Sequence, residues 1–276
     1  MVVDDVTILD VLGKQLHLHT NPKQLNEAGV VWDHAVTALA HACIPELRYR
    51  AEKIFILQGQ QQRKLAILEL GAGTGALGIA LAHAVPSIGV VLTDLEHVMP
   101  LIDTNIHLHK SNLAPRSSLE ASTLAWGCTL PALPKENEGQ GWDFILGCEI
   151  LYWGGWSLFS EDTRGPLLTT LIDACRSSTE VYFAFTVRDR NRELSFVLDD
   201  IGKYFTLRRL GPLASSKCAG NRESKIAVTK HSEDENNVAR NFISSSLEGE
   251  LVMFCARRKT KHLTGDCDGS VTLVDT

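Results

Sequence analysis

The feature that most constrains this chain is a glycine-rich turn placed directly between an apolar strand and a helix. Residues 67–82 read ILELGAGTGALGIALA. Gly71, Gly73 and Gly75 allow the backbone to turn sharply and to approach a ligand closely, because a Cβ there would clash or would forbid the required dihedral angles. The turn therefore predicts a nucleotide-type cofactor, bound where a buried strand ends.

Apolar strands and helices alternate along the chain on both sides of this turn. Strands are predicted at residues 64–70, 88–94, 142–148 and 180–187, with a strand-like segment at 124–126. Helices are predicted at residues 76–84, 98–109, 164–175 and 190–202, and two further strands at 203–210 and 249–258. The series implies an α/β fold with a doubly wound, mostly parallel sheet that helices cover on both faces.

Shorter segments flank this series. Residues 6–19 alternate apolar and polar side chains around Gly13, which predicts a short hairpin at an edge. A helix is expected to begin at Asp33, as a capping residue, and to stop near Pro45. The whole is expected to form a single domain, residues 1–258, with an N-terminal β extension at 1–28, a polar insertion at 211–248 and a disordered tail at 259–276.

Charge and cysteine content exclude several classes of protein. The net charge of -6 and the pI of 5.9 argue against a nucleic-acid binder, which neutralises phosphates with clustered lysine and arginine. The seven cysteines are scattered without a CxxC pair, which fits neither a disulfide framework nor a zinc site. The acidic N-terminus and the lack of an apolar stretch of about 20 residues predict neither a signal peptide nor a membrane span. We expect a cytoplasmic or nuclear monomer without a metal.

Two carboxylates stand at the ends of neighbouring strands. Glu69 gives the turn an acidic-x-G-x-G-x-G form, which suits a methionine-bearing nucleoside whose zwitterionic end needs carboxylate and backbone partners. Asp94 ends the next strand, where a carboxylate accepts hydrogen bonds from both ribose hydroxyls or caps the following helix. Residues 73–78 also satisfy GxGxxG, the dinucleotide fingerprint, so the turn by itself leaves a nicotinamide cofactor open.

Three more short motifs make the pattern specific. Residues 29–32 read GVVW, residues 124–127 read LAWG, and residues 149–152, after a buried strand, read EILY. Together with the GAGTG turn, these motifs resemble the seven-strand class I methyltransferases and, within that class, the family 16 protein lysine methyltransferases, over about residues 29–258. The resemblance implies a Rossmann-like methyltransferase fold, S-adenosylmethionine as the cofactor and S-adenosylhomocysteine as its product.

The resemblance also assigns cofactor contacts. Trp32 and Trp126 are expected to wall the pocket, where an aromatic face stacks on adenine or attracts the sulfonium cation. Without the resemblance, Trp32 is a hydrophobic staple before a helix and Trp126 a core residue. Cys148 is expected near the cofactor through its backbone, with no task for its thiol. The predicted cofactor-binding residues are Trp32, Glu69, Gly71, Gly73, Gly75, Asp94, Trp126 and Cys148.

The acceptor site is predicted just after the strand at 142–148. Methyl transfer needs an uncharged nucleophile in line with the methyl group and a site that excludes water. Our hypothesis is that Glu149 orients the incoming amine and favours its cationic approach, while Tyr152 contacts the lysine end. The family usually has Asp where this chain has Glu149, and the longer side chain puts the position of the acceptor in doubt.

The predicted function is the transfer of methyl groups from S-adenosylmethionine to a lysine side chain of a protein substrate. The acceptor is alternatively a small molecule, a histidine or an arginine. A noncatalytic cofactor-binding subunit is a further alternative, against which the presence of Glu149 and Tyr152 counts. A nicotinamide-dependent oxidoreductase would need a Tyr-x-x-x-Lys pair or a comparable hydride-transfer group at the cofactor.

Overall fold

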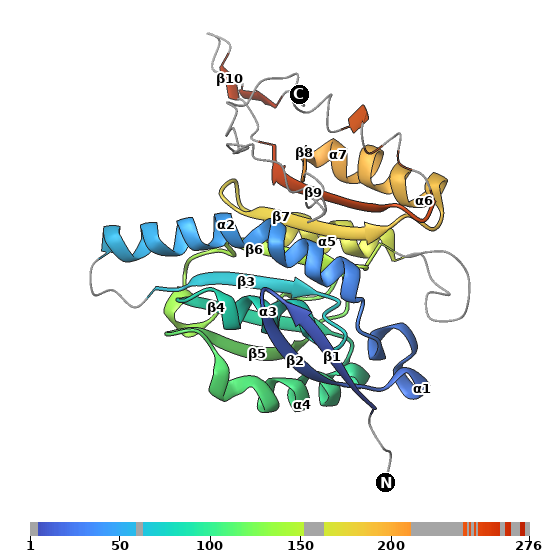
Figure 1. Cartoon of the computed structure of the whole chain (residues 1–276). Helices are drawn as coiled ribbons and strands as arrows, with labels where there is room; N and C mark the ends of the chain where they lie inside the picture. The colour runs from blue at the N-terminus through green and yellow to red at the C-terminus, as the bar shows by residue number, and fades with distance from the viewer. Residues whose placement is uncertain are drawn as a thin grey trace, which may run out of the picture.

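The computed structural model describes residues 5–58, 63–151, 163–210, 240, 241, 243, 246, 248–259, 263–265 and 271–273. Its main sheet consists of β3 (Leu65–Leu70), β4 (Ile88–Asp94), β5 (Ser118–Thr123), β6 (Phe144–Cys148), β7 (Glu180–Thr186), β8 (Phe205–Arg209) and β9 (Leu251–Arg258). The strand order is β5-β4-β3-β6-β7-β9-β8 (Figure 1). Strands β3 to β7 run parallel, and β9 is antiparallel to both β7 and β8. The predicted doubly wound, mostly parallel seven-strand sheet is therefore confirmed.

Helices cover both faces of this sheet (Figure 1). The longer ones are α2 (Asp33–Gln58), α3 (Ala76–Ala84), α4 (Met99–His109), α5 (Arg164–Ala174) and the continuous run of α6 (Arg190–Ser195), η5 (Phe196–Ile201) and α7 (Gly202–Tyr204). Leu39 of α2 and Leu81 of α3 pack with Ile67 in a core on one face. Leu171 of α5 and Phe196 of η5 pack in a second core on the other face. Each fully buried side chain of this size contributes about 1.5–3 kcal/mol.

Helix α2 continues through Pro45 to Gln58, so the expectation that it stops near Pro45 is wrong. Proline removes one backbone hydrogen bond from a helix interior and crowds the preceding turn. Leu39, Cys43 and Leu47 are nevertheless fully buried on either side of it. Packing of α2 against the sheet offsets the local cost of the proline, a balance that local sequence signals do not contain.

The third core strand is β5, at Ser118–Thr123, and the strand-like assignment of residues 124–126 is wrong. No residue of β5 is buried, because this strand forms the outer edge of the sheet beside β4. Its residues are mostly polar, and its pairing rests on backbone hydrogen bonds to β4. A search for apolar residues therefore misses β5 and selects the buried Leu124, which comes directly after the strand.

A hairpin precedes the main sheet, as predicted. It joins β1 (Asp5–Val11) to β2 (Lys14–Thr20) through Leu12 and Gly13, whose φ angles of 57° and 72° fit a two-residue turn of the left-handed kind. The hairpin forms a separate two-stranded sheet, so it is not an edge of the main one. Its contacts are with α2, α3 and α4.

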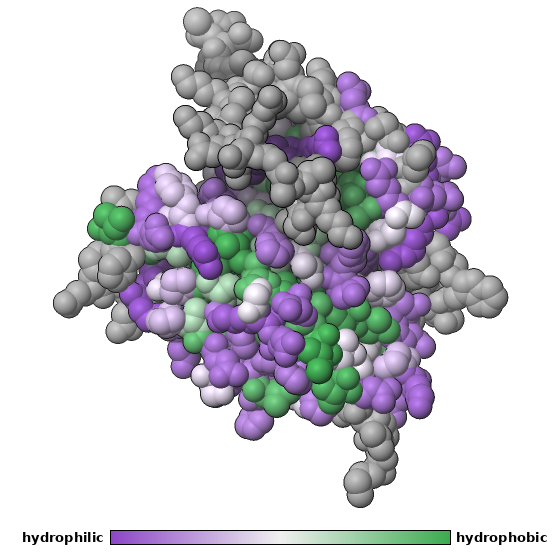
Figure 2. Space-filling view, viewed as in Figure 1, coloured by the Kyte–Doolittle hydropathy of each residue, from purple (hydrophilic) through white to green (hydrophobic). Residues whose placement is uncertain are grey.

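The two faces of the hairpin differ in burial. Leu16 and Leu18 are completely buried against the core. Val6 and Ile8 on β1 are 55% and 57% exposed. Figure 2 shows apolar surface on the side of the molecule that carries this hairpin. Because successive side chains of a strand point to opposite faces, one face of the hairpin packs against the domain and the other is exposed to solvent.

The buried Asn105 of α4 attaches this hairpin to the glycine turn. Its side-chain carbonyl accepts a hydrogen bond from His19 N at 2.7 Å, and its Nδ2 donates to His19 O at 3.1 Å and to Thr74 O at 2.9 Å. One amide side chain thus satisfies three backbone groups from the hairpin and the turn.

The remaining described elements are short: α1 (Pro22–Leu25), η1 (Asn26–Gly29), η2 (Glu96–Val98), η3 (Lys110–Asn112), η4 (Lys135–Asn137), β10 (Leu263–Gly265) and β11 (Val271–Leu273). Most of the predicted insertion at 211–248 lies outside the described residues, although Ile243 and Ser246 near its end are buried. The tail at 259–276 contains the antiparallel pair β10 and β11, and much of the rest of it is not described. No helix among the described residues has the length and apolar character to cross a bilayer.

Asn105→Ala is expected to destabilise the protein, because it leaves the buried Thr74 carbonyl and two partly buried backbone groups of His19 without their partner. The expected loss in the free energy of unfolding is about 2–4 kcal/mol. Urea denaturation of the variant and the parent protein measures this difference. Asn112→Ala, at an exposed position on η3, is the matched control and should change the free energy by less than about 0.5 kcal/mol. An equal effect of both substitutions would contradict the role of Asn105.

Candidate active site

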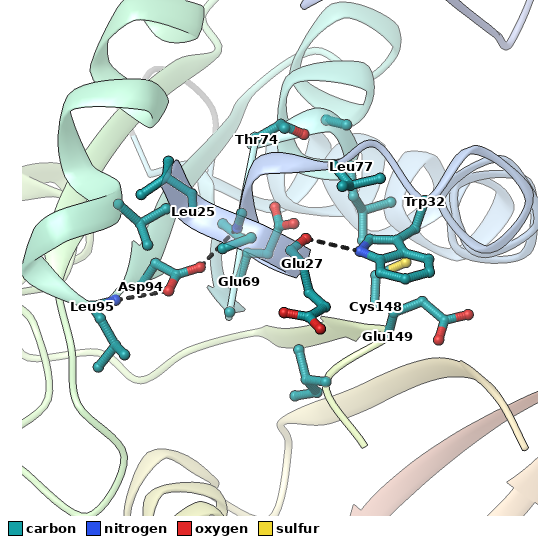
Figure 3. Close-up of a pocket in the computed structure, with 18 of the residues that line it drawn as sticks. Leu25, Glu27, Trp32, Glu69, Thr74, Leu77, Asp94, Leu95, Cys148 and Glu149 are labelled. Carbon is teal, nitrogen blue, oxygen red and sulfur yellow. Dashed lines mark hydrogen bonds between the residues drawn. The ribbon is translucent and has the colours of Figure 1, made fainter. Parts of the chain in front are cut away.

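A cavity of about 510 Å³ opens at the carboxyl ends of β3, β4 and β6 (Figure 3). This is the edge of a parallel sheet at which ligands bind. Eight predicted site residues line it: Trp32, Glu69, Gly71, Gly73, Asp94, Trp126, Cys148 and Glu149. Tyr152 lies outside the described residues, and Gly75 does not line the cavity.

The glycine turn forms the floor of the cavity. Gly71 and Gly73 have φ angles of 61° and 55°, in the region that favours glycine. A Cβ on Gly71 would lie 2.7 Å from Ile150 Cγ2, and one on Gly73 would lie 3.0 Å from Ala28 O. Both positions therefore need glycine for the backbone angle and for the close approach of neighbouring residues.

Gly75 has a different task from the cofactor contact that the sequence predicts. It has a φ of 78° and caps the amino end of α3. A Cβ there would meet Leu92 Cδ1 at 3.0 Å, beneath the turn. The third glycine thus lets α3 start close to β4.

The carboxylate of Asp94 fastens the glycine turn to the end of β4. Its Oδ2 accepts a hydrogen bond from Gly73 N at 2.8 Å, and its Oδ1 accepts one from Leu95 N at 2.8 Å. Burial raises the pKa of Asp94, while these two N–H groups act in the opposite direction. Each oxygen keeps a lone pair for a further donor, so the predicted contact to the ribose hydroxyls stays a prediction that the geometry permits.

Glu69 is almost completely buried, and its carboxyl faces α3. Its Oε2 lies 2.5 Å from the place that a Cβ on Gly78 would take, and the Gly78 N–H donates to the carboxyl. Burial raises the pKa of Glu69 to about 8, and the nearby charge of Asp94 adds to the rise. Glu69 is thus largely protonated at neutral pH and holds the amino end of α3.

The two predicted tryptophans take different positions. Trp32 Nε1 donates to Glu27 O at 3.2 Å, and the guanidinium of Arg188 lies over the Trp32 ring at 5.1 Å from its centre. Trp126 borders the other side of the turn, where its ring lies 3.6 Å from the Cβ position of Gly71. Both rings line the cavity, and one face of Trp32 is already occupied by a cation of the protein.

Cys148 ends β6 between these groups. Burial raises the pKa of its thiol well above the ordinary value, and the charges of Glu149 and Glu69 act in the same direction. The thiol is therefore protonated and a poor nucleophile, in line with the expectation that it has no chemical task.

Glu149 is held rigidly at the end of the cavity that lies opposite Asp94 (Figure 3). Its backbone has a φ of 57°, a left-handed conformation that costs a non-glycine residue about 1–3 kcal/mol and is concentrated at functional sites. Its Oε1 accepts hydrogen bonds from Thr186 N at 3.0 Å and Thr186 Oγ1 at 2.7 Å. Its Oε2 lies 2.8 Å from Arg188 Nη2. The carboxylate thus has a fixed position and a paired charge.

The cavity suits S-adenosylmethionine better than a dinucleotide. Four carboxyl groups line it, from Glu27, Glu69, Asp94 and Glu149, and the carboxylates of Glu27 and Asp94 would repel a pyrophosphate. Apolar walls and the glycine turn suit an adenosyl group, and buried carboxyls suit a cationic ligand. Tyr49 and Lys53 have the spacing of a hydride-transfer pair, but they are exposed on α2 and do not line the cavity.

Comparison with known proteins agrees with this geometry. A family model described as lysine methyltransferase matches residues 12–200. The chain belongs to the lysine methyltransferase family. The members of this family that it resembles include "EEF1A lysine methyltransferase 3" of Xenopus tropicalis, 27% identical over 77% of this chain and 78% of that protein. "Protein N-lysine methyltransferase METTL21A" of Danio rerio is 29% identical over 63% of this chain and 67% of that protein.

A solved structure agrees with the fold of this lysine methyltransferase. A 16S rRNA methyltransferase of T. Thermophilus, solved with AdoMet and guanosine, aligns with a TM-score of 0.52 at 16% identity, over 92% of this chain and 50% of that chain. At this identity the alignment establishes the seven-strand methyltransferase fold. The match to the family model and to the named relatives identifies the chain as a lysine methyltransferase, a class of enzyme whose cofactor is S-adenosylmethionine.

Sequence reasoning missed two parts of the site. One is the segment from Leu25 to Ala28, just before the GVVW motif, which contributes Leu25, Glu27 and Ala28 to the cavity lining. The other is Arg188, which follows β7 and pairs with Glu149. A signal for the second existed, since Thr186 and Arg188 follow a buried strand at the same sheet edge as Glu149. Nothing local in the sequence indicates that the first segment folds over the turn.

Asp94→Ala is expected to weaken binding of S-adenosylhomocysteine by roughly 2–3 kcal/mol, because it removes the carboxylate that holds the turn and is predicted to bind the ribose. Isothermal titration calorimetry measures the affinity. Asp103→Ala, at an exposed position on α4, is the control and should bind as the parent protein does. Unchanged affinity of Asp94→Ala would remove Asp94 from the site.

The raised pKa of Glu69 predicts that the protein loses stability as the pH rises. The folded state keeps the Glu69 proton up to about pH 8, whereas the unfolded state releases it at an ordinary pKa. The protonated Glu69 therefore contributes to the free energy of unfolding. This contribution is complete below the pKa of the unfolded state and is lost as the pH rises through about 8, and the free energy of unfolding falls by at most about 1.4 kcal/mol per pH unit.

Glu69→Gln should abolish this slope. Urea denaturation of both proteins at pH 6, 7 and 8 measures it, and titration of all other groups cancels in the difference. Parallel curves for the two proteins would mean that Glu69 ionises normally in the folded state.

Proposed function

We propose that this enzyme methylates a lysine side chain of a protein, and that EEF1A is the first substrate to test. The observation that carries the proposal is the fixed carboxylate of Glu149, which lies at the end of the cavity away from Asp94 and next to an arginine. A relative named for EEF1A matches this chain over 78% of its own length, which supports a protein acceptor of the same kind.

Glu149 and Arg188 are proposed to bind the acceptor as a pair. Glu149 Oε2 has the ion pair with Arg188 and no hydrogen bond of good geometry among the described residues, so it can accept one from an amine N–H. Arg188 balances the negative charge, so the pair does not trap an ammonium ion. This differs from the hypothesis that Glu149 favours a cationic approach, because the pairing was not visible in the sequence.

The other residues of the site are proposed to align the amine and to exclude water. When bound, the cofactor supplies an electrophilic methyl group on a cationic sulfur. The buried Ile150 and the ring of Trp32 give the cavity an apolar wall, which favours the uncharged amine that acts as the nucleophile. Tyr152 keeps its predicted contact with the lysine end as a proposal. The lysine proton is proposed to leave to water.

Glu149→Ala is expected to lower methyl transfer at least about 100-fold, because it removes the group that orients the amine, while affinity for S-adenosylhomocysteine changes little. The assay uses radiolabelled S-adenosylmethionine with purified EEF1A and, separately, with a cell lysate. Mass spectrometry then identifies the methylated side chain. Glu138→Ala, at an exposed position outside the cavity, is the control and should retain full activity.

The outcomes separate the alternatives. A labelled lysine in EEF1A or in another lysate protein supports the proposal, with the identity of the substrate decided by the labelled band. A labelled histidine, arginine or small molecule would overturn it. Full activity of Glu149→Ala would remove Glu149 from the acceptor site.

A further inference from the structure

Glu27 belongs to a segment that is pressed onto the glycine turn. It lies in η1. The carbonyl oxygen of the next residue, Ala28, lies 3.0 Å from the position that a Cβ on Gly73 would take. The Glu27 carbonyl accepts hydrogen bonds from Trp32 Nε1 at 3.2 Å and from Val30 N at 3.3 Å. The backbone of Glu27 is thus tied to one wall of the cavity while its side chain lines the interior.

The carboxylate of Glu27 lies between the two ends of the cavity. Figure 3 shows it between Asp94 on one side and Trp32 and Glu149 on the other. Its Oε2 is buried and has no hydrogen-bond partner among the described residues. A buried carboxylate oxygen without a donor carries a desolvation cost and requires an explanation.

Glu69 Oε2 and Glu149 Oε2 are also buried without a hydrogen-bond partner, but the protein compensates the charge of each of the other carboxyl groups of the cavity. Asp94 binds the amides of Gly73 and Leu95, and Glu149 binds Thr186 and Arg188. Glu69 faces the amino end of α3 and is largely protonated at neutral pH. Glu27 is therefore the carboxylate in the described lining whose charge has neither an arginine nor a backbone amide against it.

The cofactor carries one cationic group that can donate hydrogen bonds. Its sulfonium has no N–H or O–H, whereas the α-ammonium of its methionine part has three N–H donors. A carboxylate that lacks a donor is complementary to the ammonium and not to the sulfonium. The sulfur of the cofactor joins the ribose to the methionine chain, so with the ribose at Asp94, as predicted, this chain begins beside the part of the cavity that Glu27 lines.

We propose that Glu27 binds the α-ammonium group of S-adenosylmethionine, and that η1 is part of the cofactor site. The inference rests on the cofactor and not on the identity of the acceptor. A failure of the proposed lysine methylation would therefore leave it untouched.

The test compares Glu27→Gln with the parent protein by calorimetric titration. Three ligands are used: S-adenosylhomocysteine, S-adenosylmethionine, and a deaminated analogue of S-adenosylhomocysteine that lacks the α-ammonium group. The variant should bind S-adenosylhomocysteine and S-adenosylmethionine more weakly by the same factor, about 10- to 100-fold. A loss of this size is typical when a charge-assisted hydrogen bond is removed. Its affinity for the deaminated analogue should equal that of the parent protein, because the removed charge has no partner on that ligand.

Two controls keep the result interpretable. Glu96→Gln, an exposed glutamate on η2 that does not line the cavity, should bind all three ligands as the parent protein does. The unfolding temperature of Glu27→Gln without ligand should be no lower than that of the parent, because Glu27 Oε2 has no described hydrogen-bond partner to lose and the substitution removes a desolvation cost.

Three results would each overturn the proposal. Unchanged affinity for S-adenosylhomocysteine would mean that Glu27 does not contact the ammonium. Equal weakening of S-adenosylhomocysteine and its deaminated analogue would mean that the substitution distorts the cavity. A much larger loss for S-adenosylmethionine than for S-adenosylhomocysteine would mean that the carboxylate acts on the sulfonium charge.

Discussion

The hydrogen bond from Gly73 N to the Asp94 carboxylate is the contact on which the site depends. It joins the turn after β3 to the end of β4, next to the backbone bond from Ala72 N to Thr93 O. The turn can adopt this shape because Gly71 and Gly73 have positive φ angles. The position of the glycine turn then determines where α3 begins, where the cavity floor lies and which surface the N-terminal segment can contact.

The N-terminal part of the chain completes this site from the opposite direction. Asn105 fixes the end of the hairpin to the turn, and η1 then lies over Gly73. Trp32 follows, with its indole N–H bonded to the carbonyl of Glu27. Residues before the first core strand therefore form a wall of the cavity, and the hairpin supports the active site from outside the cavity.

The carboxyl groups of the cavity differ in how the protein compensates their charge. Glu69 is kept protonated by burial, Asp94 is held by two backbone amides, and Glu149 is neutralised by Arg188. Glu27 has no such compensation among the described residues, so it and Asp94 supply the negative charge that favours a cationic ligand over a phosphate. The electrostatics of the site, more than the glycine motif, separate a sulfonium cofactor from a dinucleotide.

The sequence alone determined the order of strands and helices, the glycine turn and eight residues of the cavity lining, because apolar periodicity, glycine requirements and short motifs are local properties of the chain. It did not determine the continuation of α2 through Pro45 or the polar edge strand β5, since packing on the sheet outweighs local preference at both. Only the tertiary structure brought Arg188 to Glu149 and Glu27 into the cavity. Those contacts join residues far apart in the chain, and no local pattern encodes a charge partner that arrives from another element.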